Sequence, residues 1–90
     1  MGSTLITMKL MPASQDTDLE EIKNLAKKVV EEKQGKNVKF EEQPIAFGLK
    51  AVITFFEIPE DLELESIENA LSEIENINSV QVTDMRRALG

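Results

Sequence analysis

The sequence predicts an α+β fold in which two helices cover one face of a four-stranded antiparallel sheet. Two observations identify the elements: alternating apolar residues mark four short strands, and apolar residues at helical spacing mark two helices. A third observation is their order, which is strand, helix, strand, strand, helix, strand. Two strand-helix-strand units with right-handed crossovers build the ferredoxin-like βαββαβ sandwich, so we expect a single domain over residues 1–90.

The first strand is predicted at residues 4–11 and the first helix at residues 19–30. The inward face of the strand is expected to carry Ile6, Met8 and Leu10. Helical spacing then runs from Leu19 to Val30, with Asp16 or Asp18 available as the N-cap. Gly35 is expected to end this helix.

The second and third strands are predicted at residues 37–42 and 47–58, separated by Pro44 and ended by Pro59. The Lys and Glu residues of the second strand suit an exposed edge of the sheet. The third strand is expected to place one alternating set inward: Phe47, Leu49, Ala51, Ile53 and Phe55. The opposite face of the sheet would then show Thr7, Lys9, Lys50, Val52, Thr54, Gln81 and Thr83, with Phe56 as the one aromatic nearby.

The second helix is predicted at residues 64–74, with Asp61 as its candidate cap. The fourth strand is predicted at residues 79–83, with Val80 and Val82 facing inward. Residues 84–90 are expected to form a short C-terminal tail.

Composition excludes many kinds of function. The 90 residues include no Cys and no His, which removes disulfides, thiolate nucleophiles, the commonest general base and the commonest transition-metal ligand. We therefore expect a protein that is not an enzyme and that has no metal or cofactor. No apolar stretch is long enough to span a bilayer, and the N-terminal run lacks a signal-peptide layout, so we expect a soluble, cytoplasmic protein.

The net charge of −7 is concentrated in one part of the chain. Seven acids occur there without a base: Glu60, Asp61, Glu63, Glu65, Glu68, Glu73 and Glu75. This charge argues against direct binding of nucleic acid or of an anionic membrane. The acidic residues suit either a solvated helix surface or a docking surface for a basic partner, and both interpretations stay open.

Two segments are not explained by the core. In the 44–48 turn, Pro44 stiffens the chain and Gly48 lets the backbone approach another molecule closely. Phe47 there is either the buried first residue of the third strand or a contact for a partner. In the 84–87 segment, Arg86 and Arg87 are adjacent cations. They are either solvated or paired with nearby acids, or they reach outward to a partner, for which Met85 is a further possible contact.

Three stretches, "KLMP", "EEQPIAFGLKAV" and "VQVTDMRRALG", together resemble the archaeal elongation factor 1-beta family over nearly the whole chain. The resemblance implies a translation factor that promotes GDP release from a GTPase, elongation factor 1-alpha. The implied partner is this GTPase in both its GDP-bound and its nucleotide-free state. It also implies a partner-binding site made of Pro44, Ile45, Ala46, Phe47, Gly48, Asp84, Met85, Arg86 and Arg87.

In eukaryotic relatives, the aromatic residue of a Pro-x-x-aromatic-Gly segment and a Lys close to the C-terminus act on the partner's magnesium and phosphate region. Phe47 stands at the aromatic position in this sequence. The Lys has no counterpart, because Gly90 falls at about that place, and Arg86 and Arg87 are the only nearby cations. The alternative function is that of a ferredoxin-like regulatory or small-ligand-binding module, either monomeric or homodimeric.

Overall fold

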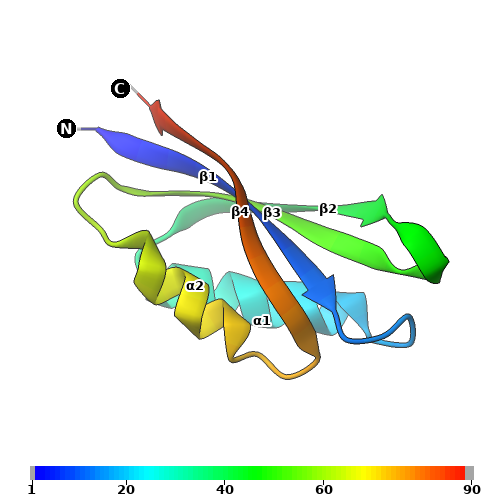
Figure 1. Ribbon diagram of the computed structural model, residues 1–90. Helices are drawn as coiled ribbons and strands as arrows, with labels where there is room; N and C mark the ends of the chain where they lie inside the picture. The colour runs from blue at the N-terminus through cyan, green and yellow to red at the C-terminus, as the bar shows by residue number, and fades with distance from the viewer. Residues whose placement is uncertain (1, 89–90) are drawn as a thin grey trace.

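The structure, a computed structural model, describes residues 2–88 and contains the six predicted elements in the predicted order (Figure 1). The elements are β1 (Ser3–Pro12), α1 (Leu19–Glu32), β2 (Lys36–Pro44), β3 (Lys50–Pro59), α2 (Leu64–Ser72) and β4 (Ile77–Ala88), with a 3-10 turn, η1 (Ala46–Gly48), between β2 and β3. The sheet is antiparallel throughout, in the order β2-β3-β1-β4. Both helices lie on one face of it, which confirms the ferredoxin-like fold.

The core lies between this helix-bearing face and the two helices. Its buried members are Ile6, Met8 and Leu10 of β1, Ile22, Ala26 and Val30 of α1, Val52, Phe56 and Ile58 of β3, and Ile67 and Leu71 of α2. The inward face predicted for β1 is confirmed, and Val80 and Val82 of β4 pack against the same core. Each large side chain buried here contributes about 1.5–3 kcal/mol of hydrophobic stabilisation.

The face predicted for the third strand is wrong. Val52, Phe56 and Ile58 belong to the core, whereas Ile53 and Phe55 pair with Lys9 and Thr7 on the other face. Both alternating sets of β3 are largely apolar, so periodicity alone cannot choose between them. Pairing with β1 decides the matter, since Met8 lies opposite Thr54 and Leu10 opposite Val52, and directly opposed residues share a face.

The sheet face away from the helices, called the open face below, therefore differs from the predicted one. It carries Phe55 in place of Phe56, and Ile53 in place of Lys50, Val52 and Thr54. Thr54 is buried on the helix-bearing face, where its hydroxyl has no hydrogen-bond partner among the described residues. One aromatic residue still lies on the open face, which is short of the stacked aromatics that RNA-recognition modules of this shape use.

The ends of α1 are defined by local hydrogen bonds. Asp18 is the N-cap, because its Oδ1 accepts hydrogen bonds from the backbone N–H groups of Glu20 (3.0 Å) and Glu21 (3.4 Å), and Asp16 is not used. At the other end, Gln34 adopts a left-handed φ of 72°, and the Gly35 N–H donates to the Val30 carbonyl at 2.8 Å. Gly35 closes the helix end because a side chain there would collide with Val30.

The second helix begins at Leu64, as predicted, and ends two residues earlier than its apolar spacing suggests. Its N-cap is Glu63, without a side-chain capping bond, so the predicted cap at Asp61 is wrong. The helix ends at Ser72, and the backbone N–H groups of Glu73 and Ile74 make shorter-range bonds to the Ala70 and Leu71 carbonyls. α1 lies over β2 and β3, and α2 lies over β4.

The predicted C-terminal tail is also wrong for its first five residues. β4 continues to Ala88, and the 84–87 segment pairs with β1, with Arg86 opposite Leu5 and Arg87 opposite Thr4. Buried and exposed residues do not alternate in this part of β4, so the sequence there lacks the alternation of apolar and polar residues that identifies a strand. Gly90, where the missing Lys would fall, lies outside the described residues. No helix within residues 2–88 is long and apolar enough to cross a membrane.

Candidate functional site

The 44–48 turn presents Phe47 to solvent at the end of the β2–β3 hairpin. The Ile45 N–H donates to the Leu49 carbonyl at 2.8 Å and the Leu49 N–H to the Ala46 carbonyl at 3.3 Å, which closes a tight loop. The Phe47 side chain is 92% exposed. This rules out the interpretation of Phe47 as a buried first residue of β3.

The backbone of this turn is strained. Phe47 has φ 63° and ψ 31°, and Gly48 follows with φ 74°, so two successive residues are left-handed. For a non-glycine residue, this conformation costs about 1–2 kcal/mol. An exposed aromatic ring on a strained backbone gives the folded chain no stability in return, and such residues are concentrated at functional sites.

The loop between β1 and α1 supports the turn, and sequence reasoning missed this contact. A side chain at Gly48 would meet the side-chain oxygen of Gln15, so the two loops lie against each other. The loop is held in a compact shape by the Ser14 and Thr17 side chains, which hydrogen-bond within it. The 13–18 stretch is rich in turn-forming residues, but nothing in the sequence says that it touches residue 48.

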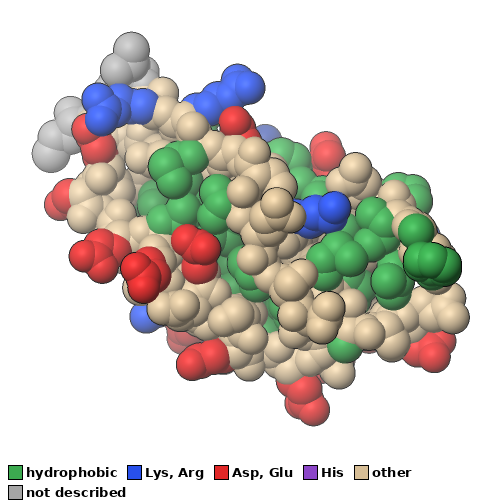
Figure 2. Space-filling view, in the orientation of Figure 1, with side chains coloured by type: hydrophobic (Ala, Val, Ile, Leu, Met, Phe, Trp, Pro, Cys, Tyr) green, Lys and Arg blue, Asp and Glu red, His purple; other side chains and the backbone are tan. Residues whose placement is uncertain are grey.

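The remaining predicted residues of the turn surround Phe47. Pro44 is the last residue of β2 and pairs with Lys50, which fixes where the hairpin begins to turn. Pro44 and Ala46 are exposed, and Ile45 is half-buried. Together with Phe47 they make an apolar end to the molecule, and Figure 2 shows hydrophobic side chains gathered at this end of the hairpin.

The 84–87 segment offers charges that are already paired. Arg86 Nε lies 2.9 Å from Asp84 Oδ2, and Arg87 Nη2 lies 3.5 Å from Glu60 Oε1. Neighbouring residues of a strand point to opposite faces, so the two guanidinium groups lie on opposite faces of the edge strand β4. Met85 is 56% exposed. Arg86 lines a shallow hollow on the open face beside Leu5 and Phe55.

The two predicted parts of the site lie at opposite ends of the sheet (Figure 1). Arg86 is opposite Leu5, whereas the 44–48 turn lies beyond Val52, which is opposite Leu10. The five residue steps from Leu5 to Leu10 alone span roughly 17 Å. The structure therefore brings the residues of each group together but does not bring the two groups together.

The charge distribution follows the sequence analysis. Acidic side chains gather along α2 and the loop before it, and Lys and Arg side chains lie beside the two chain ends (Figure 2). Hydrogen bonds from Ser3 Oγ and then Asn37 Nδ2 hold the pKa of Glu57 below its usual value. No group of three potential metal-ligating side chains occurs within the described part of the chain.

Comparison with known proteins identifies the relatives of this chain. The model of the EF-1 guanine nucleotide exchange domain matches residues 5–88. Elongation factor 1-beta of Methanobrevibacter smithii is 42% identical over 91 residues, which cover 99% of this chain and 100% of the relative. The proteins of the same name from Methanothermobacter thermautotrophicus and Methanocaldococcus jannaschii are 38% and 35% identical, covering 99% and 98% of this chain and all of each relative.

Proposed function

Since the chain belongs to the EF-1 guanine nucleotide exchange family, we propose that it carries out guanine nucleotide exchange on elongation factor 1-alpha, from which it releases GDP. An exchange factor binds the nucleotide-free GTPase more tightly than the loaded one. By linkage, the nucleotide then weakens binding of the factor to the same extent. No bond is made or broken on this chain, so the absence of His and Cys is no obstacle.

The observation that carries the proposal is the exposure of Phe47 on a strained turn. Because backbone hydrogen bonds already fix the turn that carries the ring, little backbone entropy is lost when a partner buries it. We propose that the 44–48 turn inserts beside the magnesium and phosphate region of the GTPase. Pro44, Ile45, Ala46 and Gly48 fix the backbone that carries the ring.

The free energies of the proposed contacts are large enough to account for faster GDP release. Release that is a thousandfold faster corresponds to about 4 kcal/mol of activation free energy. Burial of one Phe contributes about 1.5–3 kcal/mol, and one hydrogen bond to a charged group about as much. One aromatic and one polar contact are together sufficient.

The 84–87 segment takes a different part in this proposal from the one that the sequence suggested. Because it lies at the far end of the sheet, Asp84, Met85, Arg86 and Arg87 contact the GTPase at a second place, away from Phe47. To do so, Arg86 and Arg87 leave Asp84 and Glu60. Exposed ion pairs of this kind cost little to break.

The test is stopped-flow release of a fluorescent GDP analogue from elongation factor 1-alpha. We expect Phe47→Ala to keep the melting temperature and to lower the release rate at least tenfold, because its ring is the main contact. Leu25→Ala, which truncates a less exposed apolar side chain on α1, is the control and is expected to release GDP at the rate of the unmodified protein. Unchanged release with Phe47→Ala would remove the ring from the site.

The family match favours exchange over the alternative of a regulatory or small-ligand-binding module. A role in translation elongation also implies that the protein acts in the cytoplasm, without direct contact to nucleic acid or membrane. Equilibrium binding separates the two functions: an exchange factor prefers the nucleotide-free GTPase, whereas a ligand-binding module shows no preference between the free and GDP-loaded forms.

A further inference from the structure

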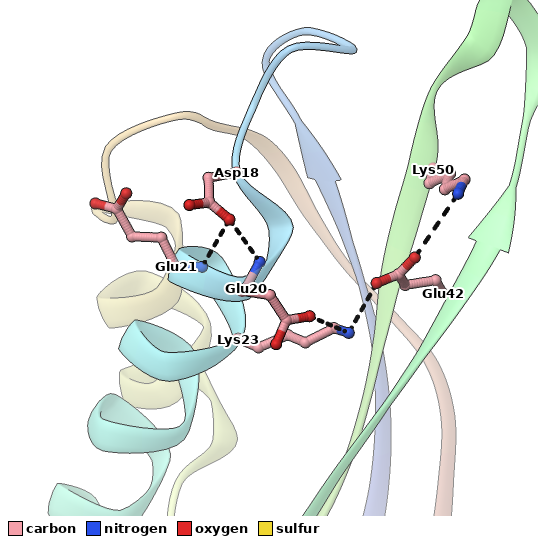
Figure 3. Close-up of polar contacts among 6 residues, drawn as sticks. All are labelled: Asp18, Glu20, Glu21, Lys23, Glu42 and Lys50. Atoms are coloured by element: carbon pink, nitrogen blue, oxygen red, sulfur yellow. Dashed lines mark hydrogen bonds and ion pairs between the residues drawn. The ribbon is translucent and has the colours of Figure 1, made fainter.

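A row of alternating charges connects α1 to the hairpin that carries Phe47 (Figure 3). Lys23 Nζ donates to Glu42 Oε2 at 2.8 Å and to Glu20 Oε2 at 3.0 Å. Lys50 Nζ lies 4.0 Å from the other Glu42 oxygen, Oε1. The proposed function assigns no part to these residues.

The charges of this row lie next to the turn that carries Phe47. Glu42 lies in β2, two residues before Pro44, and Lys50 is the first residue of β3, so these two charges flank the 44–48 turn. Glu42 pairs with Val52, a core residue, and therefore points to the helix-bearing face. Lys23 reaches it from α1, so this contact joins the hairpin to the layer of helices.

Beyond Phe40, which still packs against the core, the hairpin has few other supports. Within residues 2–88, β2 is an edge strand that pairs only with β3, so the turn projects beyond the sheet with support on one side. Beyond the hairpin, the contact of Gly48 with Gln15 supports the turn. A contact from the hairpin to α1 therefore limits how far the hairpin can tilt toward or away from the helices.

The Lys23–Glu42 contact is less exposed to solvent than the Lys23–Glu20 contact within the helix. The side chains of Lys23 and Glu42 are 20% and 34% exposed, whereas that of Glu20 is 76% exposed. Water screens the Lys23–Glu42 pair less than it screens the pair within the helix. In agreement, the hydrogen bond to Glu42 is the main cause that raises the pKa of Lys23, and the bond to Glu20 is second.

We propose that Lys23 and Glu42 are positioning residues for exchange: their ion pair holds the hairpin against α1 and so sets the direction in which Phe47 enters the GTPase. The inference rests on the proposed function. Neither residue needs to touch the GTPase. A change in the direction of the ring lowers the fraction of encounters in which it reaches its pocket, which affects the rate at low factor concentration most.

The chain offers a matched pair of variants. Glu42→Gln and Glu20→Gln each remove one negative charge and reduce one ion pair of Lys23 to a neutral hydrogen bond at most, but only Glu42→Gln weakens the contact to the hairpin. In stopped-flow release of a fluorescent GDP analogue, we expect Glu42→Gln to lower the second-order rate constant about three- to fivefold, the size expected for a partly exposed ion pair. Glu20→Gln is expected to stay within about 1.5-fold of the unmodified protein.

A double variant shows whether the effect passes through Phe47. In a Phe47→Ala background, Glu42→Gln is expected to cause no further loss, because there is no ring left to direct. Lys23→Met breaks the same contact from α1, keeps most of the side-chain volume, and is expected to reproduce the loss. Thermal melting monitors the fold of every variant.

Each result has a definite meaning. If Glu42→Gln and Lys23→Met are as active as Glu20→Gln while Phe47→Ala is slow, the positioning role is wrong and the proposed function stands. If the loss with Glu42→Gln persists in full beside Phe47→Ala, Glu42 acts by another route and the inference is again wrong. If Phe47→Ala itself has normal activity, the proposed function fails and the inference fails with it.

Discussion

The two ends of the sheet differ in what they offer to a partner. At the hairpin end, Phe47 is 92% exposed on a left-handed backbone and gains almost nothing from the fold. At the end with the two chain termini, Arg86 and Arg87 already have acidic partners within the protein. Binding at the hairpin end adds new contacts, whereas binding at the other end exchanges existing ones. The larger contribution to affinity is therefore expected at the hairpin end.

The sharpest test of this difference is Phe47→Gly. Glycine adopts a positive φ without strain, so this variant removes the ring and relieves the left-handed strain together. We expect exchange to fall at least tenfold while the melting temperature stays the same or rises, measured by GDP release and by thermal melting. A large drop in melting temperature would mean that the ring supports the fold. Phe47 would then, like the arginines at the other end, already have contacts within the protein.

The second test keeps the ring and changes its support. Gly48→Ala places a side chain at φ 74° and against the Gln15 oxygen, and a substitution of this kind destabilises by about 1 kcal/mol or more. We expect the melting temperature to fall by a few degrees, with a smaller loss of exchange than with Phe47→Gly. Equal stability of Gly48→Ala and the unmodified protein would show that the turn tolerates other backbone conformations.

The third test addresses the other end. Arg86→Ala combined with Arg87→Ala is expected to slow exchange about two- to threefold, since exposed charges chiefly affect the rate of encounter. The loss should shrink as salt is added, because salt screens exposed charges. GDP release measured at low and high ionic strength checks both statements. A rate equal to that of the unmodified protein at every salt concentration would exclude the arginines from the interface.

The smallest effect is expected from pH. The pKa of Glu57, near the chain termini, and that of Glu42, near the hairpin, are both lower in the folded protein than the ordinary value of 4.5. Each carboxylate therefore stabilises the folded protein at pH values above 4.5. This stabilisation is lost as the pH falls through the lowered pKa of the folded state. Melting curves between about pH 7 and pH 3 should show a slightly shallower decline for Glu57→Gln than for the unmodified protein. Identical declines would contradict the shift at Glu57.

Much of the fold follows from the sequence, for identifiable reasons. The inward face of β1 and the buried face of α1 could be predicted because polar residues separate their apolar ones at a clear period. The face of β3 could not, because Val52 and Ile53, like Phe55 and Phe56, are apolar neighbours. The true length of β4 was hidden because residues 84–87 are mostly polar or charged and alternate on no buried face.

The candidate site could be predicted in part. The residues of the 44–48 turn were found from Pro44, Phe47 and Gly48, and the interpretation of Phe47 as exposed needed the structure. The left-handed φ of Phe47 has no local signal, since glycine would be expected there. The distance between the turn and the arginines, and the contact of Lys23 with Glu42, depend on pairing between distant strands and on helix placement.

The pairing of Ser3 with both Pro59 and Ala88 puts the start and the end of the described chain side by side, at the end of the sheet opposite the turn. A purification tag, a fluorescent fusion or a surface tether attached through either end would therefore crowd Arg87 and leave Phe47 unobstructed. Immobilised in this way, the protein would present its aromatic tip outward to a GTPase in flow, and its arginines would be the residues that the attachment masks.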